Sequence, residues 1–204
     1  MLIHLRNLVI PHFMQRLRRS DKGTMLIEFA FLFPITLIML LGGFETFRLL
    51  MAHRKANMTA MSIGNLISQN KVLSNAAVSN IFDAVDNIMQ PLELKGNGQI
   101  FVSYVIGTNT GTTITLQCRG TADTTYASKI GAVNNEADLA RLPGNFTLAE
   151  YETVVVSEVV YRYKPVIINL SGWLNNSMFA AHDVYHVAVQ KPRYGEVQFT
   201  SGCP

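Results

Sequence analysis

Hydrophobic residues are concentrated in one uninterrupted stretch near the N-terminus. Residues 24–50 are almost all apolar, and Glu28 is the one charged side chain between Thr24 and Phe44. An α-helix rises about 1.5 Å per residue, so roughly 20 residues cross the apolar core of a bilayer. A buried helix of a soluble protein is the alternative, but such helices are seldom apolar on every face. The pattern therefore predicts a membrane-spanning helix over residues 24–50.

The residues that follow predict that this helix continues beyond the membrane. Apolar and small residues run without a proline to about Gln69, and Gly64 is the weakest position because glycine disfavours helices. Glu45 and Arg48, three residues apart, are expected as neighbours on the helix surface where it leaves the membrane. Pro34 lies inside the apolar run and is expected to kink the helix, since it removes a backbone hydrogen bond.

Farther along, the hydrophobic pattern predicts shorter elements. Residues 71–90 have apolar side chains at helical spacing, with Ser74 or Asn75 as the N-cap and Pro91 at the end. A short helix is expected within 136–141, and a helical turn around Trp173. Segments rich in Val, Ile, Tyr and Thr predict four strands, at 99–106, 112–119, 151–164 and 183–191.

The order of these elements predicts the fold class. Residues 107–111 suit the loop of a hairpin, and 151–164 is the longest strand and the expected centre of the sheet. The fold class is therefore α+β: a long N-terminal transmembrane helix followed by a small antiparallel β-sheet domain with one or two packed helices.

Charge orients the apolar segment. The net charge is only +3, but five positive residues precede the apolar run with only Asp21 to oppose them: Arg6, Arg16, Arg18, Arg19 and Lys22. A basic cluster can bind nucleic acid, but directly before an apolar span it is typical of the cytoplasmic flank of a membrane helix. A cleaved secretory signal is disfavoured because the apolar run is too long and no small-residue cleavage site follows. We therefore expect a cytoplasmic N-terminus, an extracytoplasmic domain and no nucleic-acid partner.

Candidate chemistry is sparse. Cys118 and Cys203 both follow the span, so a disulfide is expected in an oxidising compartment, with two unpaired thiols as the alternative. His182 and His186 are four residues apart, which suits a metal on a helix but falls in a predicted strand without a third ligand nearby. The sequence has no phosphate-binding loop and no Gly-x-Ser-x-Gly motif. We therefore expect no metal, no cofactor, no small-molecule substrate and no enzymatic activity.

The start of the apolar helix carries a resemblance to a known family. Gly23 is followed five residues later by Glu28 and then Phe29, after a basic leader. This arrangement resembles the processing site of type IV pilin-like proteins, and more closely that of the TadE-like pseudopilins and minor pilins of tight-adherence (Flp) pilus systems. The resemblance covers roughly residues 16–66 and no specific relative is recognised in 70–204. It is supported by Lys22, Pro34, Gly42, Gly43 and the helix exit from Phe44 to Arg48.

The resemblance implies a mechanism. A prepilin peptidase would cut after Gly23, so that Thr24 becomes the first residue and Glu28 the fifth, and Glu28 would neutralise the free amine of a neighbouring subunit. The implied partners are this peptidase, other pilin-like subunits, the inner-membrane assembly platform and membrane lipid. The implied location is the bacterial inner membrane, with the C-terminal domain in the periplasm, or a pilus after assembly.

The expected organisation is a leader at 1–23, a transmembrane helix at 24–50, a helix extension at 51–70 and an extracytoplasmic α+β domain at 71–204. The leader is longer than in many members of the family, and a shorter one beginning at Met14 is the alternative. A second interpretation of the whole chain is an uncleaved, signal-anchored periplasmic binding or sensor protein, in which Glu28 lies at the level of the lipid headgroups.

Overall fold

A computed structural model describes residues 22–120, 125–144, 147–166, 180–200 and 203. Its first element is the helix α2 (Lys22–Ser68), 47 residues long. This confirms the long N-terminal helix expected from the sequence, and it ends within a residue or two of the expected position. The chain divides into two compact units, residues 1–44 and 45–204, which are described separately.

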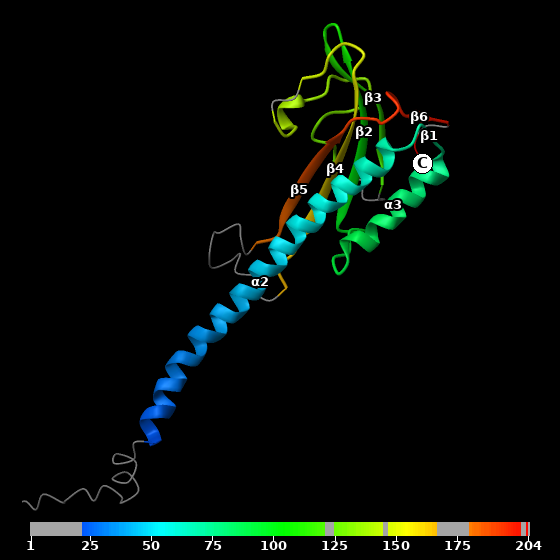
Figure 1. Cartoon of the computed structure of the whole chain (residues 1–204). Coiled ribbons are helices and arrows are strands. Elements are labelled where there is room, and N and C mark those ends of the chain that lie inside the picture. Colours follow the sequence, from blue (N-terminus) through cyan, green and yellow to red (C-terminus); the bar gives the residue numbers. More distant parts are fainter. Residues whose placement is uncertain (1–21, 121–124, 145–146, 167–179, 201–202, 204) are drawn as a thin grey trace, which may run out of the picture. The chain divides into compact units, whose positions relative to one another are not determined.

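The second unit is an α+β domain, and its sheet is the predicted antiparallel one. Four strands lie in the order β3-β2-β4-β5, while β1 and β6 form a separate parallel pair (Figure 1). After α2 the elements are β1 (Val72–Leu73), α3 (Asn75–Met89), β2 (Gly98–Thr108), β3 (Gly111–Arg119), the 3₁₀ helix η1 (Leu139–Arg141), β4 (Thr153–Tyr163), β5 (His182–Gln190) and β6 (Gln198–Phe199). The helical turn expected around Trp173 lies outside the described residues.

The central strands are apolar on both faces because both faces of the sheet are covered. Ten of the eleven residues of β4 are buried, all but Arg162, and eight of the ten are Val, Tyr or Thr. β4 pairs with β2 on one side and with β5 on the other, so the longest predicted strand does lie inside the sheet. The β2–β3 hairpin is tighter than expected, since Thr108 already pairs with Gly111.

One face of the sheet is covered by the C-terminal half of α2, which approaches it closely through small residues. Ala52, Ala56 and Ala60 recur every four residues and are fully buried. The Ser157 hydroxyl of β4 donates a 2.6 Å hydrogen bond to the Ala60 carbonyl oxygen. A Cβ added at Gly64 would lie 2.9 Å from the Ser157 Oγ, so no larger residue fits there without a shift. The glycine that weakens the helix is thus explained by its contact with the sheet.

The helix α3 lies on the same face. Ser74 is its N-cap, with its side chain accepting a hydrogen bond from the Ala77 amide at 3.3 Å, which resolves the choice between Ser74 and Asn75. At the other end, the Lys55 ammonium of α2 donates to the Ile88 carbonyl at 3.0 Å. A positive charge at the C-terminal end of a helix is favourable because the helix dipole is negative there. The two helices and the sheet share one hydrophobic core.

Irregular segments cover the opposite face, and a buried carboxylate fixes one of them. Glu158 of β4 is fully buried and accepts hydrogen bonds from the Ser128 hydroxyl, the Lys129 amide at 2.9 Å and the Tyr185 hydroxyl at 2.8 Å. Burial, then the charge of Glu158, raises the pKa of Tyr185 above its ordinary value. A buried charge is tolerated only when it is well hydrogen-bonded. Glu158 therefore has a structural explanation as the anchor of the segment around Lys129.

Candidate functional site

The first unit presents apolar side chains in every direction. In residues 24–40 no described residue is buried, and the large apolar side chains are 41–77% exposed. Moving more than ten such side chains out of water is worth on the order of 20 kcal/mol. By length and composition this is the one helix in the described residues that could cross a membrane. An N-terminal helix compatible with single-pass membrane anchoring is therefore present.

The hydroxyl of Thr36 inside this apolar segment is satisfied within the helix itself. Pro34 provides no amide hydrogen, and Thr36, two residues later, turns its hydroxyl back to the helix. That hydroxyl lies 2.9 Å from the Phe33 carbonyl oxygen and 3.1 Å from that of Leu32. A hydroxyl bonded in this way can enter a bilayer without an unpaired donor.

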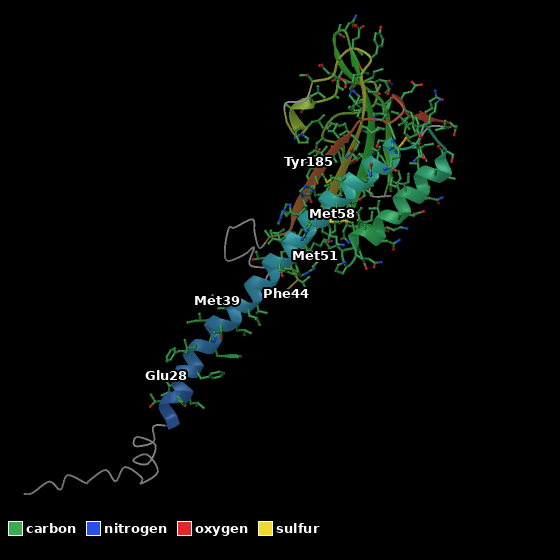
Figure 2. All side chains as sticks on the ribbon, in the orientation of Figure 1. Glu28, Met39, Phe44, Met51, Met58 and Tyr185 are labelled. Carbon is green, nitrogen blue, oxygen red and sulfur yellow. A yellow bond between two sulfur atoms is a disulfide. The ribbon has the colours of Figure 1, made fainter. Side chains whose placement is uncertain are left out.

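The residues of the predicted processing site lie in the first two turns of α2. Gly23 is helical, and a Cβ added there would meet no atom within 4 Å. Glu28, labelled in Figure 2, and Phe29 are exposed. The Phe29 ring lies 5.5 Å from that of Phe33. Nothing in the described fold therefore requires glycine at position 23, nor a carboxylate at position 28.

The helix exit is more buried than the sequence indicated. Glu45 was expected on the helix surface beside Arg48, but it is 1% exposed. Its carboxylate accepts a hydrogen bond from the Tyr163 hydroxyl and lies 3.3 and 3.4 Å from the Val166 amide nitrogen. The Arg48 Nη1 is 4.0 Å from Glu45 Oε1. The surface prediction is wrong because the end of β4 packs over this turn of α2.

A spacing in the sequence could have located Glu45 correctly. It lies 7 and 11 residues before Ala52 and Ala56, which places all three on the same face of a helix. That face is the buried one. Burial, followed by the hydrogen bond to Glu45 and the charge of Glu45, raises the pKa of Tyr163. Glu45, Tyr163 and the Val166 amide together form what we call the exit clamp.

A pair of histidines lies farther along the same helix. The His53 Nδ1 of α2 is 3.2 Å from the His186 Nε2 of β5, with the rings nearly perpendicular. Burial lowers the pKa of both, and the charge of His182 adds to this for His53. The sequence placed His182 and His186 on one strand, but it gave no signal for His53 as a partner. No group of three or more His, Cys, Asp or Glu side chains among the described residues could hold a metal ion.

The two cysteines are joined in the structure. Cys118 of β3 and Cys203 form a disulfide, with Cα atoms 5.1 Å apart and a sequence separation of 85. Cys118 is completely buried in the core that the helices share with the sheet. On an entropic account, closing a loop of this length stabilises the fold by about 4 kcal/mol. The C-terminus is further held by β6, which pairs with β1.

Comparison with known proteins agrees with the arrangement at the start of α2. Residues 23–64 match the family of TadE-like proteins. The TadE-like segment covers about a fifth of the chain. It begins at Gly23, includes the exit-clamp residue Glu45, and ends at Gly64, where α2 touches the sheet. No curated protein and no solved structure matches the chain.

The TadE-like segment therefore supports a pilus-related, membrane-anchored and pilin-like protein. TadE-like proteins are a structural rather than an enzymatic family, and the similarity suggests an interaction with other pilus components. The resemblance inferred from Gly23, Glu28 and the apolar helix is confirmed at the level of the family.

Proposed function

We propose that this protein is a single-pass component of a tight-adherence pilus system of the bacterial inner membrane, processed by a prepilin peptidase after Gly23. It acts as a minor pilin or in pilus assembly. The observation that carries the proposal is the TadE-like segment, whose first residue is Gly23. The exposed apolar surface of residues 24–40 supports it, because that surface needs lipid or other helices around it.

The open space around Gly23 favours the idea that glycine is selected there by another protein rather than by the fold. A Cβ at this position would meet open space, so the fold itself does not select glycine. A peptidase that binds an extended backbone does select it, because glycine adopts many conformations and has no side chain to clash. The first turn of α2 would unwind in the peptidase. Water would then cleave the amide bond between Gly23 and Thr24, leaving a carboxylate on Gly23 and an amine on Thr24.

Cleavage would change the electrostatics of the membrane helix. It would release the leader, and with it the positive cluster that favours a cytoplasmic N-terminus: Arg6, Arg16, Arg18, Arg19 and Lys22. The new amine of Thr24 lies among apolar residues, where a charge is stable only when it is paired. Glu28, exposed on the surface of α2, provides such a partner for the amine of a neighbouring subunit. The pair would fix the register between two helices.

The disulfide favours a periplasmic location for the domain. Disulfides persist in the bacterial periplasm and are rare in the cytoplasm, and Cys118–Cys203 joins two distant parts of the domain. Together with the basic residues before the span, this supports a cytoplasmic N-terminus and a periplasmic C-terminal domain.

The N-terminus of the mature protein tests the proposal. We expect mass spectrometry to find Thr24 as the first residue in cells that have the prepilin peptidase, and Met1 in cells that lack it. Met1 in both strains would instead support the uncleaved signal-anchored binding or sensor protein.

A matched pair of glycine variants tests the recognition of Gly23. Gly23→Leu should block cutting, whereas Gly43→Leu should be cut normally, because a Cβ meets open space at both positions and only the first adjoins the cleaved bond. Cutting of Gly23→Leu at the wild-type rate would contradict the role assigned to this glycine.

Glu28→Ala should leave membrane insertion and cutting intact but abolish assembly. Normal assembly of that variant would leave Glu28 as a residue at headgroup level.

A further inference from the structure

Two histidines of different elements meet where α2 packs on β5. His182 and His186 are four residues apart on β5. The alternation of a strand places both on the side of Val184 and Ala188, which belong to the hydrophobic core that α2 shares with the sheet. His53 lies on α2, and its Nδ1 is 3.2 Å from the His186 Nε2. The sequence paired His186 with His182, whereas the structure pairs it with a histidine of the long helix.

The backbone that carries the two histidines is held in place by burial. Ala52 and Ala56, on either side of His53 in α2, are fully buried. Ala188 follows His186 by two residues on the same side of β5 and is 6% exposed. β5 is hydrogen-bonded to β4 in one continuous register. Ligands that are already in place bind an ion more tightly, because ordering them on binding costs free energy.

The distance between the two nitrogens suits one shared metal ion. An imidazole nitrogen lies about 2.0–2.1 Å from a bound Zn²⁺, so two of them on one ion are about 2.9 Å apart at a right angle and about 3.4 Å apart at the tetrahedral angle. The observed 3.2 Å lies between these two values. It is also the length of a hydrogen bond between the rings, which is the contact expected without metal.

The protonation of the rings permits both contacts. Burial lowers the pKa of both histidines, which favours the neutral form at neutral pH. A neutral imidazole has one N–H and one lone pair, and a metal ion binds the lone pair. In the hydrogen bond, one of the facing nitrogens carries its proton. In the metal complex, that proton moves through water to the remote nitrogen of the same ring, so the neutral pair binds an ion without net release of a proton.

Water completes the coordination of an ion at this pair. His53 is exposed and His186 is partly exposed, so solvent reaches the rings. Among the described residues, no third His, Cys, Asp or Glu joins them in a metal-binding group. Two imidazoles with water favour Cu²⁺ and Zn²⁺ over Mg²⁺ and Ca²⁺, which prefer oxygen ligands. Of the first two, Cu²⁺ is bound more tightly by a given set of ligands.

We propose that His53 Nδ1 and His186 Nε2 together bind one divalent transition-metal ion, Cu²⁺ or Zn²⁺, which joins α2 to β5. The ion would connect the long helix directly to the outer strand of the sheet. His182 stays outside this site, because four residues of strand span about 13 Å and its Nδ1 lies 2.9 Å from the Ala180 carbonyl oxygen. Since the ion binds the folded chain, it should raise the melting temperature of the domain.

The experiment measures metal binding by the full-length protein in detergent, purified without a polyhistidine tag. The chain has five histidines, and the two before Gly23, His4 and His12, are replaced by Gln in every protein compared. Titration calorimetry with Zn²⁺ should show one bound ion per chain, and titration with Mg²⁺ should show none. We expect His53→Gln and His186→Gln each to weaken the binding of Zn²⁺ at least tenfold. Since His53 is exposed, His53→Gln should fold as the parent does, which circular dichroism without metal checks.

His182→Gln is the matched control, because it lies on the same side of β5 but outside the pair, and it should change the affinity less than twofold. Cu²⁺ gives a second readout. Its electron paramagnetic resonance spectrum should show coupling to two imidazole nitrogens in the parent and to one in either variant of the pair. The proposal is overturned if the parent binds no ion saturably, or if His182→Gln weakens binding as much as His53→Gln. Metal binding requires no cleavage after Gly23, so this test and that of the proposed function fail independently.

Discussion

The exit clamp should stabilise the domain mainly through the Tyr163 hydroxyl. Tyr163→Phe removes the hydrogen bond to the buried Glu45 carboxylate and leaves the packing of the ring intact. Two other contacts of the carboxylate are longer, with the Val166 amide at 3.3 and 3.4 Å and Arg48 at 4.0 Å. A hydrogen bond to a charged group contributes about 1.5–3 kcal/mol. For a domain of this size, that lowers the melting temperature by about 3–12 °C.

Chemical and thermal unfolding of the full-length protein in detergent, followed by circular dichroism, measures this loss. Tyr151→Phe is the matched control, because Tyr151 is 78% exposed and should change stability by less than about 0.5 kcal/mol. A double-mutant cycle of Tyr163→Phe with Glu45→Gln should give a coupling free energy of at least about 1 kcal/mol, since the two side chains are in direct contact. The reasoning is refuted if Tyr163→Phe is no more destabilising than Tyr151→Phe.

The same clamp predicts a dependence on alkaline pH. The folded pKa of Tyr163 is raised above the ordinary value of 10.0, first by burial and then by Glu45. A hydroxyl with a raised pKa contributes its full stability below pH 10 and loses it as the pH rises above that value. Unfolding midpoints should therefore fall above pH 10, and less steeply in Tyr163→Phe. Parallel curves for the two proteins would show that Tyr185 or another group dominates.

Three further predictions concern the sheet, the histidines and the disulfide. Gly98→Ala should destabilise the domain by about 1–3 kcal/mol in urea unfolding, because the new Cβ would lie 2.3 Å from the Val160 carbonyl oxygen. The pKa values of His53 and His186 are lowered from 6.5, so the folded state binds protons less readily than the unfolded one. Stability should decrease as the pH falls below 6.5, and a His186→Gln variant should show a smaller slope over the same range. Reduction of the disulfide should cost about 4 kcal/mol, and Cys118→Ser measured without reductant should match the reduced wild type.

The regular elements were predictable because their signals are local. Runs of β-branched and aromatic residues predicted all four long strands, and the 3.6-residue period predicted α3. Val72–Leu73 and Gln198–Phe199 were missed, since a strand of two residues has no period to detect. The pairing of β1 with β6 depends on a contact between residues that are more than a hundred positions apart in the chain.

The candidate site was only partly predictable, for a different reason. The resemblance of Gly23, Glu28 and the apolar helix to a known family could be recognised because these residues form one continuous segment of the sequence. The buried face of Glu45 could have been inferred from its spacing to Ala52 and Ala56, but its hydrogen-bond partner could not, because Tyr163 lies 118 residues later. His53 was missed in the same way, since its partner is on β5. Each of these errors arises where a side chain is defined by a distant strand.

The pairing of β1 with β6 determines when this domain can be completed. Strand β1, the first after α2, pairs with β6, which includes residue 199, and the disulfide includes residue 203. Since the ribosome makes the chain from its N-terminus, neither contact can form until residues 199 and 203 have been made. A chain that stopped before residue 198 would contain the residues of α2 and of the four-stranded sheet but would lack β6 and the covalent link. The β1–β6 pair and the disulfide therefore distinguish a chain that reaches residue 203 from one that stops earlier, in structure as well as in length.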